Sequence, residues 1–399
     1  MKYIERTSKL IKDYFNILSQ NYPDWLDEYI ETERILKQQY ISVTCGKIYS
    51  KLFDYNDYSS LDHSIAVALI IWNFTHDKKQ TLSGLFHDIA TPAFKHCIDF
   101  LNGDYMNQES TEELTKTLIK DSKDIMKLLE RDDIKLEEVC DYHIYPIADN
   151  DIPMLSADRL EYSLSNDLIV FKTNTLEDIR EIYNDIEVQT NENGIIELGF
   201  KTKKIARQFV KNTSRLSVAY RDDATRFYMQ AIADILKKLS EDGLINKIDL
   251  YELKESEVID IIKKSNYSEV FEELINATKV HTSTEEPEDV YYVKHGAKVR
   301  YIDPLFNGKR ISKECKIAQK MIEKNLSCNM DKYVFLDKRL NILKENLNVA
   351  KRGGGVAKGA KDLYEKETKK SAISKSNSLN YKYIEEQKQI ENKNKKESE

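Results

Sequence analysis

Residues 83–96 form a mostly apolar stretch that nevertheless contains an adjacent pair, His87 and Asp88, and a further histidine, His96. The apolar neighbours predict that this stretch is buried. Removing an imidazole or a carboxylate from water costs several kcal/mol unless the group finds a partner inside the protein. A divalent metal ion is one partner that suits both groups together. The chain must therefore fold so that these side chains meet a metal ion or other polar groups.

Two other stretches place a metal-binding type of side chain in a similar apolar setting. His63 lies at the start of residues 64–74, where apolar residues fall at helical spacing, and Asp158 lies further along the chain. A second His–Asp pair, His76 and Asp77, lies in a polar, loop-like stretch and is not expected to take part. The alternative is that all these residues are core or capping residues, the usual role of a lone buried histidine.

The order of these residues resembles the HD-domain phosphohydrolase superfamily, in which a histidine, a His–Asp pair and an aspartate bind metal. The resemblance implies that the metal ligands are His63, His87, Asp88 and Asp158. Within the superfamily, residues 87–99 resemble the HDxGHGPFSHxxD/E motif of the dNTP triphosphohydrolases, the branch that includes the SAMHD-type enzymes. Residues 157–162 resemble the DADRxDY motif of the same branch.

This resemblance extends over about residues 60–305 and implies further site residues. A helix led by Arg226, with Lys237 further along, resembles the family helix whose lysine contacts phosphate, and residues 298–304 resemble a KVRYxDP segment. The implied substrate-binding residues are Arg159, Tyr162, Arg226 and Lys237, and the implied catalytic residues are His96, Asp99 and Glu113. His96, oriented by Asp99, would donate the proton that the leaving oxygen needs.

Each of these side chains also has a purely structural alternative. His96 could be a buried structural histidine. Arg226 and Lys237 could form surface salt bridges. Tyr162 could stack on a sugar or only pack against its neighbours.

Several positions depart from the triphosphohydrolase pattern. Thr91 and Glu112 stand where the family has two histidines, and Ser60 replaces the arginine before the first ligand. Ser165 and Asn166 replace an Arg–Asp pair, and Leu236 replaces the histidine beside the phosphate lysine. The metal ligands are intact, whereas several phosphate and catalytic contacts are not. Metal binding is therefore better supported than dNTP specificity, and a diverged substrate or a lost activity are both alternatives.

These residues predict a metal-dependent phosphohydrolase acting on a nucleotide, in the first place a dNTP triphosphohydrolase that releases nucleoside and triphosphate. The alternatives are a hydrolase of another nucleotide or phosphoester, and a catalytically weak HD protein that binds a nucleotide or a partner. The mixed nitrogen and oxygen ligands suit Mn²⁺, Mg²⁺, Fe²⁺, Ni²⁺ or Zn²⁺ and do not distinguish among them. The resemblance to oligomeric SAMHD-like enzymes makes a homo-oligomer a further expectation.

Composition predicts a mostly α-helical, cytoplasmic protein without a membrane span. The 399 residues include 12 Gly and 6 Pro, which favours helices, and 41% are hydrophobic, which is enough to bury a core. The formal charge of −7 argues against extended nucleic-acid binding. The longest strongly apolar run, residues 64–74, is too short to cross a bilayer. Five scattered cysteines and an N-terminus without an apolar signal core predict free thiols in a reducing compartment.

The chain divides into four predicted regions. Residues 1–59 are expected to form an N-terminal helical arm, 60–172 the HD-domain metal-binding core, and 173–350 a smaller α+β C-terminal region of helices with short strands. Residues 351–399 are rich in Lys, Glu, Ser and Asn. We expect them to form a disordered charged tail, because such a composition cannot bury enough apolar surface to offset the entropy of ordering.

Local patterns predict elements around the site. Pro92 suits the first turn of a helix, which would then hold His96 and Asp99 on one face. The predicted helix caps are Ser60 or Asp62, Thr81, and a capping box of Ser110 with Glu113. Further expectations are a long helix over 202–239, broken near 221–223, strands at 291–293 and 298–302 joined by a turn at Gly296, and a loop at 142–146 whose His143 either reaches the site or stays on the surface.

Overall fold

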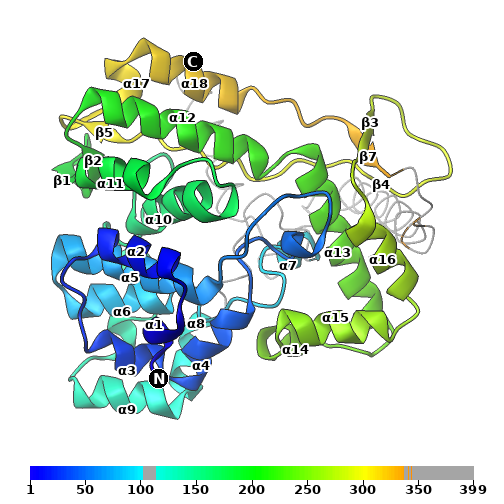
Figure 1. Ribbon diagram of the computed structural model, residues 1–399, viewed down its shortest axis with the longest axis horizontal. Coiled ribbons are helices and arrows are strands. Elements are labelled where there is room, and N and C mark those ends of the chain that lie inside the picture. Colours follow the sequence, from blue (N-terminus) through cyan, green and yellow to red (C-terminus); the bar gives the residue numbers. More distant parts are fainter. Residues whose placement is uncertain (102–113, 337–339, 341–342, 344–399) are drawn as a thin grey trace, which may run out of the picture. The chain divides into compact units, whose positions relative to one another are not determined.

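A computed structural model of the chain describes residues 1–101, 114–336, 340 and 343, which belong to one compact unit. Helices dominate it, as the scarcity of glycine and proline predicts, so the expectation of a mostly α fold is confirmed (Figure 1). The N-terminal part contains α1 (Tyr3–Arg6), α2 (Lys9–Leu18), α3 (Leu26–Ile30), α4 (Glu33–Leu36) and two short 3-10 helices, η1 (Lys37–Tyr40) and η2 (Lys47–Tyr49).

The middle of the chain supplies the helices that surround the predicted site. They are α5 (Ser60–Thr75), α6 (Lys78–Phe86), α7 (Cys97–Leu101), α8 (Thr115–Asp121), α9 (Lys123–Arg131), the 3-10 helices η3 (Leu136–Glu138) and η4 (Tyr142–Ile144), α10 (Ala157–Ser165) and a π-helical turn η5 (Asn166–Val170). Helix α10, which contains Asp158, continues directly into η5.

The C-terminal part combines helices with short strands. Its helices are α11 (Leu176–Asn184), α12 (Lys203–Ala219), α13 (Asp223–Glu241), α14 (Lys247–Glu252), α15 (Glu255–Lys263), α16 (Ser268–Asn276), α17 (Ile311–Glu314) and α18 (Lys316–Leu326). Its strands are β1 (Ile186–Thr190), β2 (Ile196–Phe200), β3 (His281–Ser283), β4 (Tyr292–Val293), β5 (Leu305–Phe306), β6 (Lys309–Arg310) and β7 (Tyr333–Phe335).

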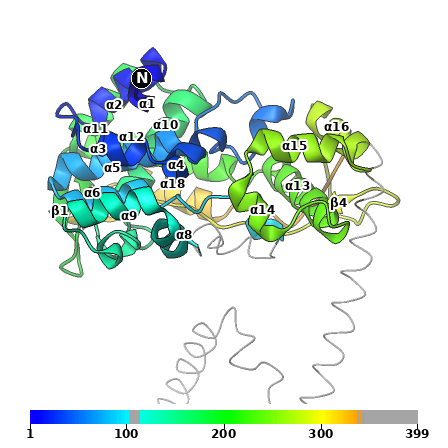
Figure 2. The same ribbon diagram turned by 90° about the horizontal axis from the view of Figure 1, so that it is seen from below.

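Helix α5 lies at the centre of the core. Every residue from Ser60 to Ile71 is buried, and α5 packs against α2, α6 and α10 (Figures 1 and 2). A helix that is apolar on nearly all sides is stable only inside a protein. Its first turn is buried with the rest, so the polar side chain of His63 is withdrawn from water together with its apolar neighbours.

The cap of α5 is one residue earlier than predicted. Ser59, rather than Ser60 or Asp62, precedes the helix, and its Oγ accepts a hydrogen bond from the backbone N–H of Asp62 at 3.0 Å. Ser60 already has helical geometry and lies inside the core, where its side chain cannot reach a free N–H of the first turn.

The second His–Asp pair forms the junction between α5 and α6. His76 ends α5 in the left-handed conformation with φ 51°. Asp77 caps α6 by accepting hydrogen bonds from the backbone N–H groups of Lys79 and Gln80, at 2.8 and 3.1 Å. The cap predicted at Thr81 is wrong, because Asp77 already satisfies these donors and Thr81 lies inside the helix.

The helix predicted to begin at Pro92 is also wrong. Phe94 and Lys95 have φ values of 62° and 43°, a left-handed pair that a right-handed helix cannot contain, and α7 begins only at Cys97. His96 therefore precedes the helix, whereas Asp99 lies in its first turn.

Two small sheets complete the C-terminal part. In the first, of order β1-β2-β5-β6, β1 and β2 are antiparallel and β2 pairs in parallel with β5, so that Gly199 lies opposite Leu305. A turn over residues 191–194 connects β1 with β2. Asn307 and Gly308, with φ of 51° and 70°, connect β5 with β6 in the left-handed geometry that tight hairpins require.

The second sheet corrects a predicted hairpin. Strand β4 pairs with β7, placing Val293 opposite Val334, and residues 298–302 form no strand. The order is β3-β7-β4, so the partner of β4 comes from a distant segment that a local pattern cannot reveal. Residues 298–302 lead instead to Asp303, whose backbone N–H donates to the carbonyl of Pro153 at 2.9 Å.

Several other expectations can be compared directly. The long helix is broken as predicted, into α12 and α13, and Asp222 caps α13 by accepting from the N–H of Thr225 at 2.7 Å. All five cysteines are free thiols. Among the described residues, no helix is long and apolar enough to cross a membrane. The capping box at Ser110 and Glu113 and the tail over 351–399 lie outside the described residues.

Candidate metal centre

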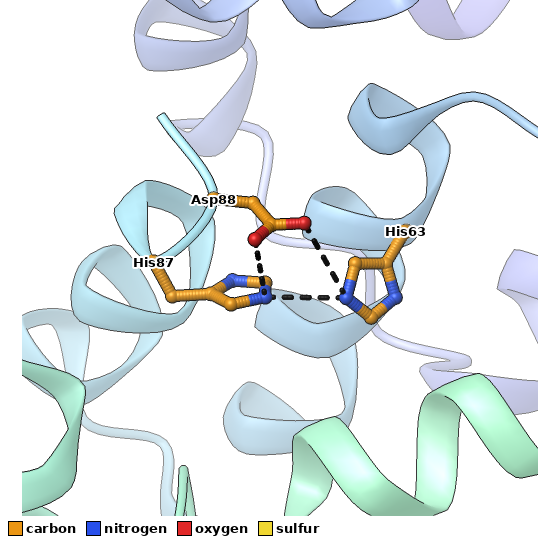
Figure 3. Close-up of side chains that lie close together, drawn as sticks. All are labelled: His63, His87 and Asp88. Atoms are coloured by element: carbon orange, nitrogen blue, oxygen red, sulfur yellow. Dashed lines mark hydrogen bonds and ion pairs between the residues drawn. The ribbon is translucent and has the colours of Figure 1, made fainter. Parts of the chain in front are cut away.

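Three helices bring the four predicted metal ligands together. His63 lies in the first turn of α5, His87 and Asp88 follow the end of α6, and Asp158 lies in the first turn of α10. Because α5 packs against both α6 and α10, positions that are far apart in sequence meet at one point of the core. Figure 3 shows the two imidazole rings and the carboxylate of Asp88 facing one another.

The distances are those of atoms that could share one ion. Nε2 of His63 lies 3.1 Å from Nε2 of His87, and Oδ1 of Asp158 lies 3.2 and 3.8 Å from these two atoms. The oxygens of Asp88 lie 3.8 and 3.9 Å from the same nitrogens. Ligand atoms about 2.1 Å from one metal ion, at roughly a right angle, are about 3.0 Å apart. The buried group of His63, His87 and Asp88, with Asp158 beside it, could therefore hold a metal ion.

Outer hydrogen bonds fix which nitrogen of each histidine faces the site. His87 Nδ1 donates to the carbonyl oxygen of Gly84 at 2.7 Å, so Nε2 is the ring nitrogen that faces the site. His63 Nδ1 is hydrogen-bonded to the carboxylate of Glu161. Metal-binding histidines usually have such an acceptor on the other ring nitrogen.

Glu161 is a residue of the candidate site that the sequence reasoning missed. Its side chain is fully buried, and besides His63 it accepts hydrogen bonds from the hydroxyls of Tyr58, at 2.9 Å, and Tyr14, at 3.3 Å. One signal for it was present in the sequence, because Glu161 follows Asp158 by three residues and so projects from the same face of α10.

The charges around the cluster favour ionised carboxylates. Burial alone would raise the pKa of Asp88, but the ammonium of Lys95 and the two imidazoles hold it well below its ordinary value. Asp158 is likewise buried, and the hydrogen bond and charge of His63 lower its pKa. Burial alone would lower the pKa of His63, but the carboxylates of Glu161 and Asp158 outweigh it and raise the pKa to about 10. A bound cation would take the place of the proton that these carboxylates hold on His63.

Lys95 is the second residue that sequence reasoning missed. Its side chain is 7% exposed, and Nζ lies 2.6 Å from Oδ2 of Asp88. The predicted helix over this segment would not have given Lys95 this direction. The observed backbone is left-handed at Phe94 and Lys95, and no sequence pattern signals this.

The predicted catalytic pair forms in spite of the missing helix. His96 Nδ1 lies 2.9 Å from Oδ2 of Asp99, which is fully buried, while the ring of His96 is 25% exposed. Burial lowers the pKa of His96, although Asp99 opposes this effect. The third predicted catalytic residue, Glu113, lies outside the described residues.

The predicted substrate-binding residues are arranged in two ways. Arg159 adjoins the cluster on α10, where it donates to Asn150 and to the carbonyl of Met154, at 3.1 Å for the latter, and lies 3.5 Å from Asp149. Tyr162 lies one turn of α10 further on, and the centroid of its ring is 6.2 Å from that of Tyr220.

The other two lie on α13 and have partners of their own. Arg226 is fully buried and donates to the carbonyls of His295 and Met330 and to Asp223. Lys237 is 45% exposed and lies 4.0 Å from Glu241. Among the described residues, neither forms a hydrogen bond or ion pair with the four predicted metal ligands, and their substrate-binding role stays a prediction.

His143 does not reach the four ligands directly. Its ring is 51% exposed and lies 3.0 Å from Asp141 and 3.4 Å from Asp149, which is buried beside Arg159. Its neighbour Tyr142 contacts the ring of His87 with centroids 5.0 Å apart, so η4 covers one side of the cluster.

Solved structures share this fold. A phosphohydrolase from Bacteroides thetaiotaomicron superposes with a TM-score of 0.53 at 15% identity, over 78% of this chain and 94% of that one. A hypothetical protein from Aquifex aeolicus superposes with a TM-score of 0.56, also at 15% identity, over 79% of this chain and 93% of that one. Comparison of the sequence with protein-family models and with curated proteins finds no match. The likeness is therefore one of fold.

Proposed function

We propose that this protein is a metal-dependent phosphohydrolase that acts on a nucleotide, with a dNTP cut to nucleoside and triphosphate as the first candidate substrate. The observation on which this rests is the buried cluster of two imidazoles and two carboxylates, His63, His87, Asp88 and Asp158, on three packed helices. The shared fold with a structure named as a phosphohydrolase supports the reaction class, and the motif resemblance supports the substrate.

The four side chains would hold the ion, and Glu161 and the carbonyl of Gly84 would keep both imidazoles in the orientation that binding needs. A divalent ion in this position would lower the pKa of a bound water and neutralise a phosphate oxygen. The remaining work belongs to the neighbouring side chains. Arg159 adds a positive charge beside the cluster, which suits the charge that develops on a phosphate in the transition state.

His96 is the proposed proton donor for the leaving oxygen. Its Nδ1 is held by Asp99, so Nε2 is the nitrogen left to deliver a proton. Burial lowers the pKa of His96, which makes its protonated form a stronger acid, and the Asp99 carboxylate keeps that form accessible. The same pair of residues would serve with any phosphate ester whose leaving oxygen reaches His96.

The test is a hydrolysis screen with the metal ion controlled. The protein is stripped with a chelator, reloaded separately with Mn²⁺, Mg²⁺, Fe²⁺, Ni²⁺ or Zn²⁺, and assayed on dNTPs, NTPs and simple phosphoesters with product analysis. We expect turnover that requires the metal and is lost in His87→Asn but kept in His76→Asn. Release of phosphate or pyrophosphate in place of triphosphate would replace the proposed substrate and keep the hydrolase. Failure of every metal-loaded sample to hydrolyse anything would favour a nucleotide- or partner-binding protein.

A further inference from the structure

The backbone at Phe94 and Lys95 is strained in a way that only contacts from other elements can maintain. Both residues have side chains, yet both adopt left-handed φ values, 62° and 43°. Each such residue costs about 1–2 kcal/mol relative to an ordinary conformation. Strain of this kind persists where the surrounding structure fixes it, and it concentrates at functional sites.

Two neighbouring elements fix the strained pair. The backbone N–H of Ala93 donates to the carbonyl of Leu250 at 2.8 Å, and that of Phe94 donates to Glu255 at 3.3 Å. The ring of Phe94 packs so closely on Gly46 that a Cβ added to this glycine would lie 2.4 Å from a ring carbon. Backbone and ring are thus both held, and the direction of the Lys95 side chain follows from them.

The strained turn points a cation into the metal centre. Lys95 is 7% exposed, and its Nζ lies 2.6 Å from Oδ2 of Asp88. An ammonium group has three N–H donors. Among the described residues, Nζ of Lys95 donates one hydrogen bond, to Asp88. Its other two N–H donors, beside the cluster, remain for another anion or for water.

The charge balance shows why an anionic substrate would need this lysine. Asp88, Asp158 and Glu161 place three carboxylates around two imidazoles, which must be neutral to bind a metal. A divalent ion would neutralise two of these three charges and leave the cluster negative. The ammonium of Lys95 balances the third, so that the loaded centre no longer repels a phosphate.

We propose that Lys95 is a catalytic residue that binds the substrate phosphate directly. Anchored on Asp88, its ammonium donates to a non-bridging oxygen of the phosphate held beside the metal ion. The ligand class is a phosphate ester or its inorganic product. The proposal rests on the proposed function, and it adds a phosphate contact at a position that the motif resemblance does not assign.

The test measures phosphate binding separately from turnover. Wild type, Lys95→Met and Lys95→Arg are loaded with Mn²⁺, their metal content is measured by elemental analysis, and inorganic phosphate is titrated by calorimetry. We expect Lys95→Met to keep its metal ion and to bind phosphate about 10- to 100-fold more weakly, since it loses a charge-assisted hydrogen bond. Lys95→Arg, which keeps the charge, should recover part of this loss.

A second buried lysine provides the matched control. Lys47 is also buried, but its ammonium lies over the rings of Phe53 and Tyr55, 5.7 Å from each centroid. Lys47→Met should therefore leave phosphate binding unchanged, even if it lowers the melting temperature. This control separates the loss of a phosphate contact from general destabilisation of the protein.

Three results would overturn the proposal. If Lys95→Met binds phosphate as tightly as wild type, the lysine only neutralises Asp88, and the hydrolase proposal stands without it. If Lys95→Met loses its metal ion along with phosphate, Lys95 acts through the metal site and is not a phosphate ligand. If wild type holds no metal ion, the proposed function and this proposal fail together. Wild type that binds phosphate through Lys95 but hydrolyses nothing would keep the contact and reject only the enzyme.

Discussion

The chain contains the His–Asp dipeptide twice, and the two copies differ in almost everything that matters for chemistry. His76 and Asp77 form the polar junction between α5 and α6, where one ends a helix and the other caps the next. His87 and Asp88 follow the other end of α6, where both are buried and within 3.9 Å of ligand-type atoms from other helices. The same two residue types thus end and cap helices on one side of α6 and form part of a candidate metal centre on the other.

The difference shows that the candidate site is defined by burial and by side chains from several elements that meet there, rather than by the dipeptide itself. At the junction the hydrogen-bonding capacity of Asp77 is used by backbone N–H groups of its own helix. At the cluster, Asp88 and His87 interact with side chains from three other elements, so a substitution there also affects those partners. Substitutions in the two copies should therefore differ in kind as well as in size.

The largest expected effect is that of Asp88→Ala. It removes a predicted ligand and also leaves the ammonium of Lys95 buried without its counter-charge, which costs about 3–5 kcal/mol. We expect loss of bound metal by elemental analysis, a large drop in melting temperature and no hydrolysis. Equal metal content in wild type and Asp88→Ala would show that the cluster is not the metal site. Asp88→Ala combined with Lys95→Met should regain much of the lost stability without regaining metal.

The next largest effect separates the metal ligands from the proton donor. His96→Ala should keep its metal ion and lose about 10²–10⁴-fold in kcat, the usual contribution of a general acid. Asp99→Asn should lose less, because Asp99 orients the imidazole and does not transfer the proton. His143→Ala is the comparison, since His143 is half exposed and bonded to Asp141. A larger loss in His143→Ala than in His96→Ala would move the proton donor to η4.

A pH effect tests how strongly burial acts on a carboxyl group near the strained turn. Burial raises the pKa of Glu255 to about 8, from an ordinary value of 4.5. The folded protein therefore keeps a proton that the unfolded chain has released. The free energy of unfolding should fall as pH rises from about 4.5 to about 8, by at most about 5 kcal/mol.

Glu255→Gln should flatten this part of the stability curve, because the amide oxygen still accepts from the N–H groups of Ser42 and Phe94 while no charge is buried. Glu252→Gln is the control, since Glu252 is half exposed and pairs with Arg34. Denaturant unfolding at several pH values gives both curves. Parallel curves for wild type and Glu255→Gln would contradict the prediction.

The smallest effect belongs to the other His–Asp pair. Asp77→Ala removes a helix cap and should cost about 1 kcal/mol of stability, with no change in metal content or rate. His76→Asn should cost little, because asparagine tolerates the left-handed conformation that His76 adopts. Loss of metal from either variant would break the contrast between the two dipeptides.

Patterns within single elements predicted much of the fold. Apolar spacing located α5, and the polar residues 221–223 located the break between α12 and α13, because both signals depend on neighbouring residues. The pairing of β4 with β7 and the late start of α7 were not predictable in this way. Both depend on segments far along the chain, β7 in one case and Leu250 with Glu255 in the other.

The same division holds at the site. His63, His87, Asp88 and Asp158 could be proposed as a set because a family resemblance supplies their order, and the structure brings them together. Glu161 and Lys95 escaped notice because a buried charged residue looks like a surface one until its partner is known. Arg226 shows the converse, since a residue proposed from a motif has backbone carbonyls and Asp223 as its partners here.

The hydrogen bond between Tyr14 and Glu161 has a consequence for how the centre is made. Tyr14 comes from α2, in the predicted N-terminal arm, and Glu161 comes from α10, 147 positions later. The hydroxyl of Tyr14 and the imidazole of His63 share one carboxylate, so neither is in its final setting until α10 has been synthesised and packed. During synthesis from the N-terminus, polar groups of α2 and α5 that are buried in the folded protein stay exposed until α10 is made. Contacts between segments so far apart in sequence slow folding. Binding of the proposed metal ion should thus be a late event in folding, and a chain released before α10 should have neither a stable α2 nor the candidate metal centre.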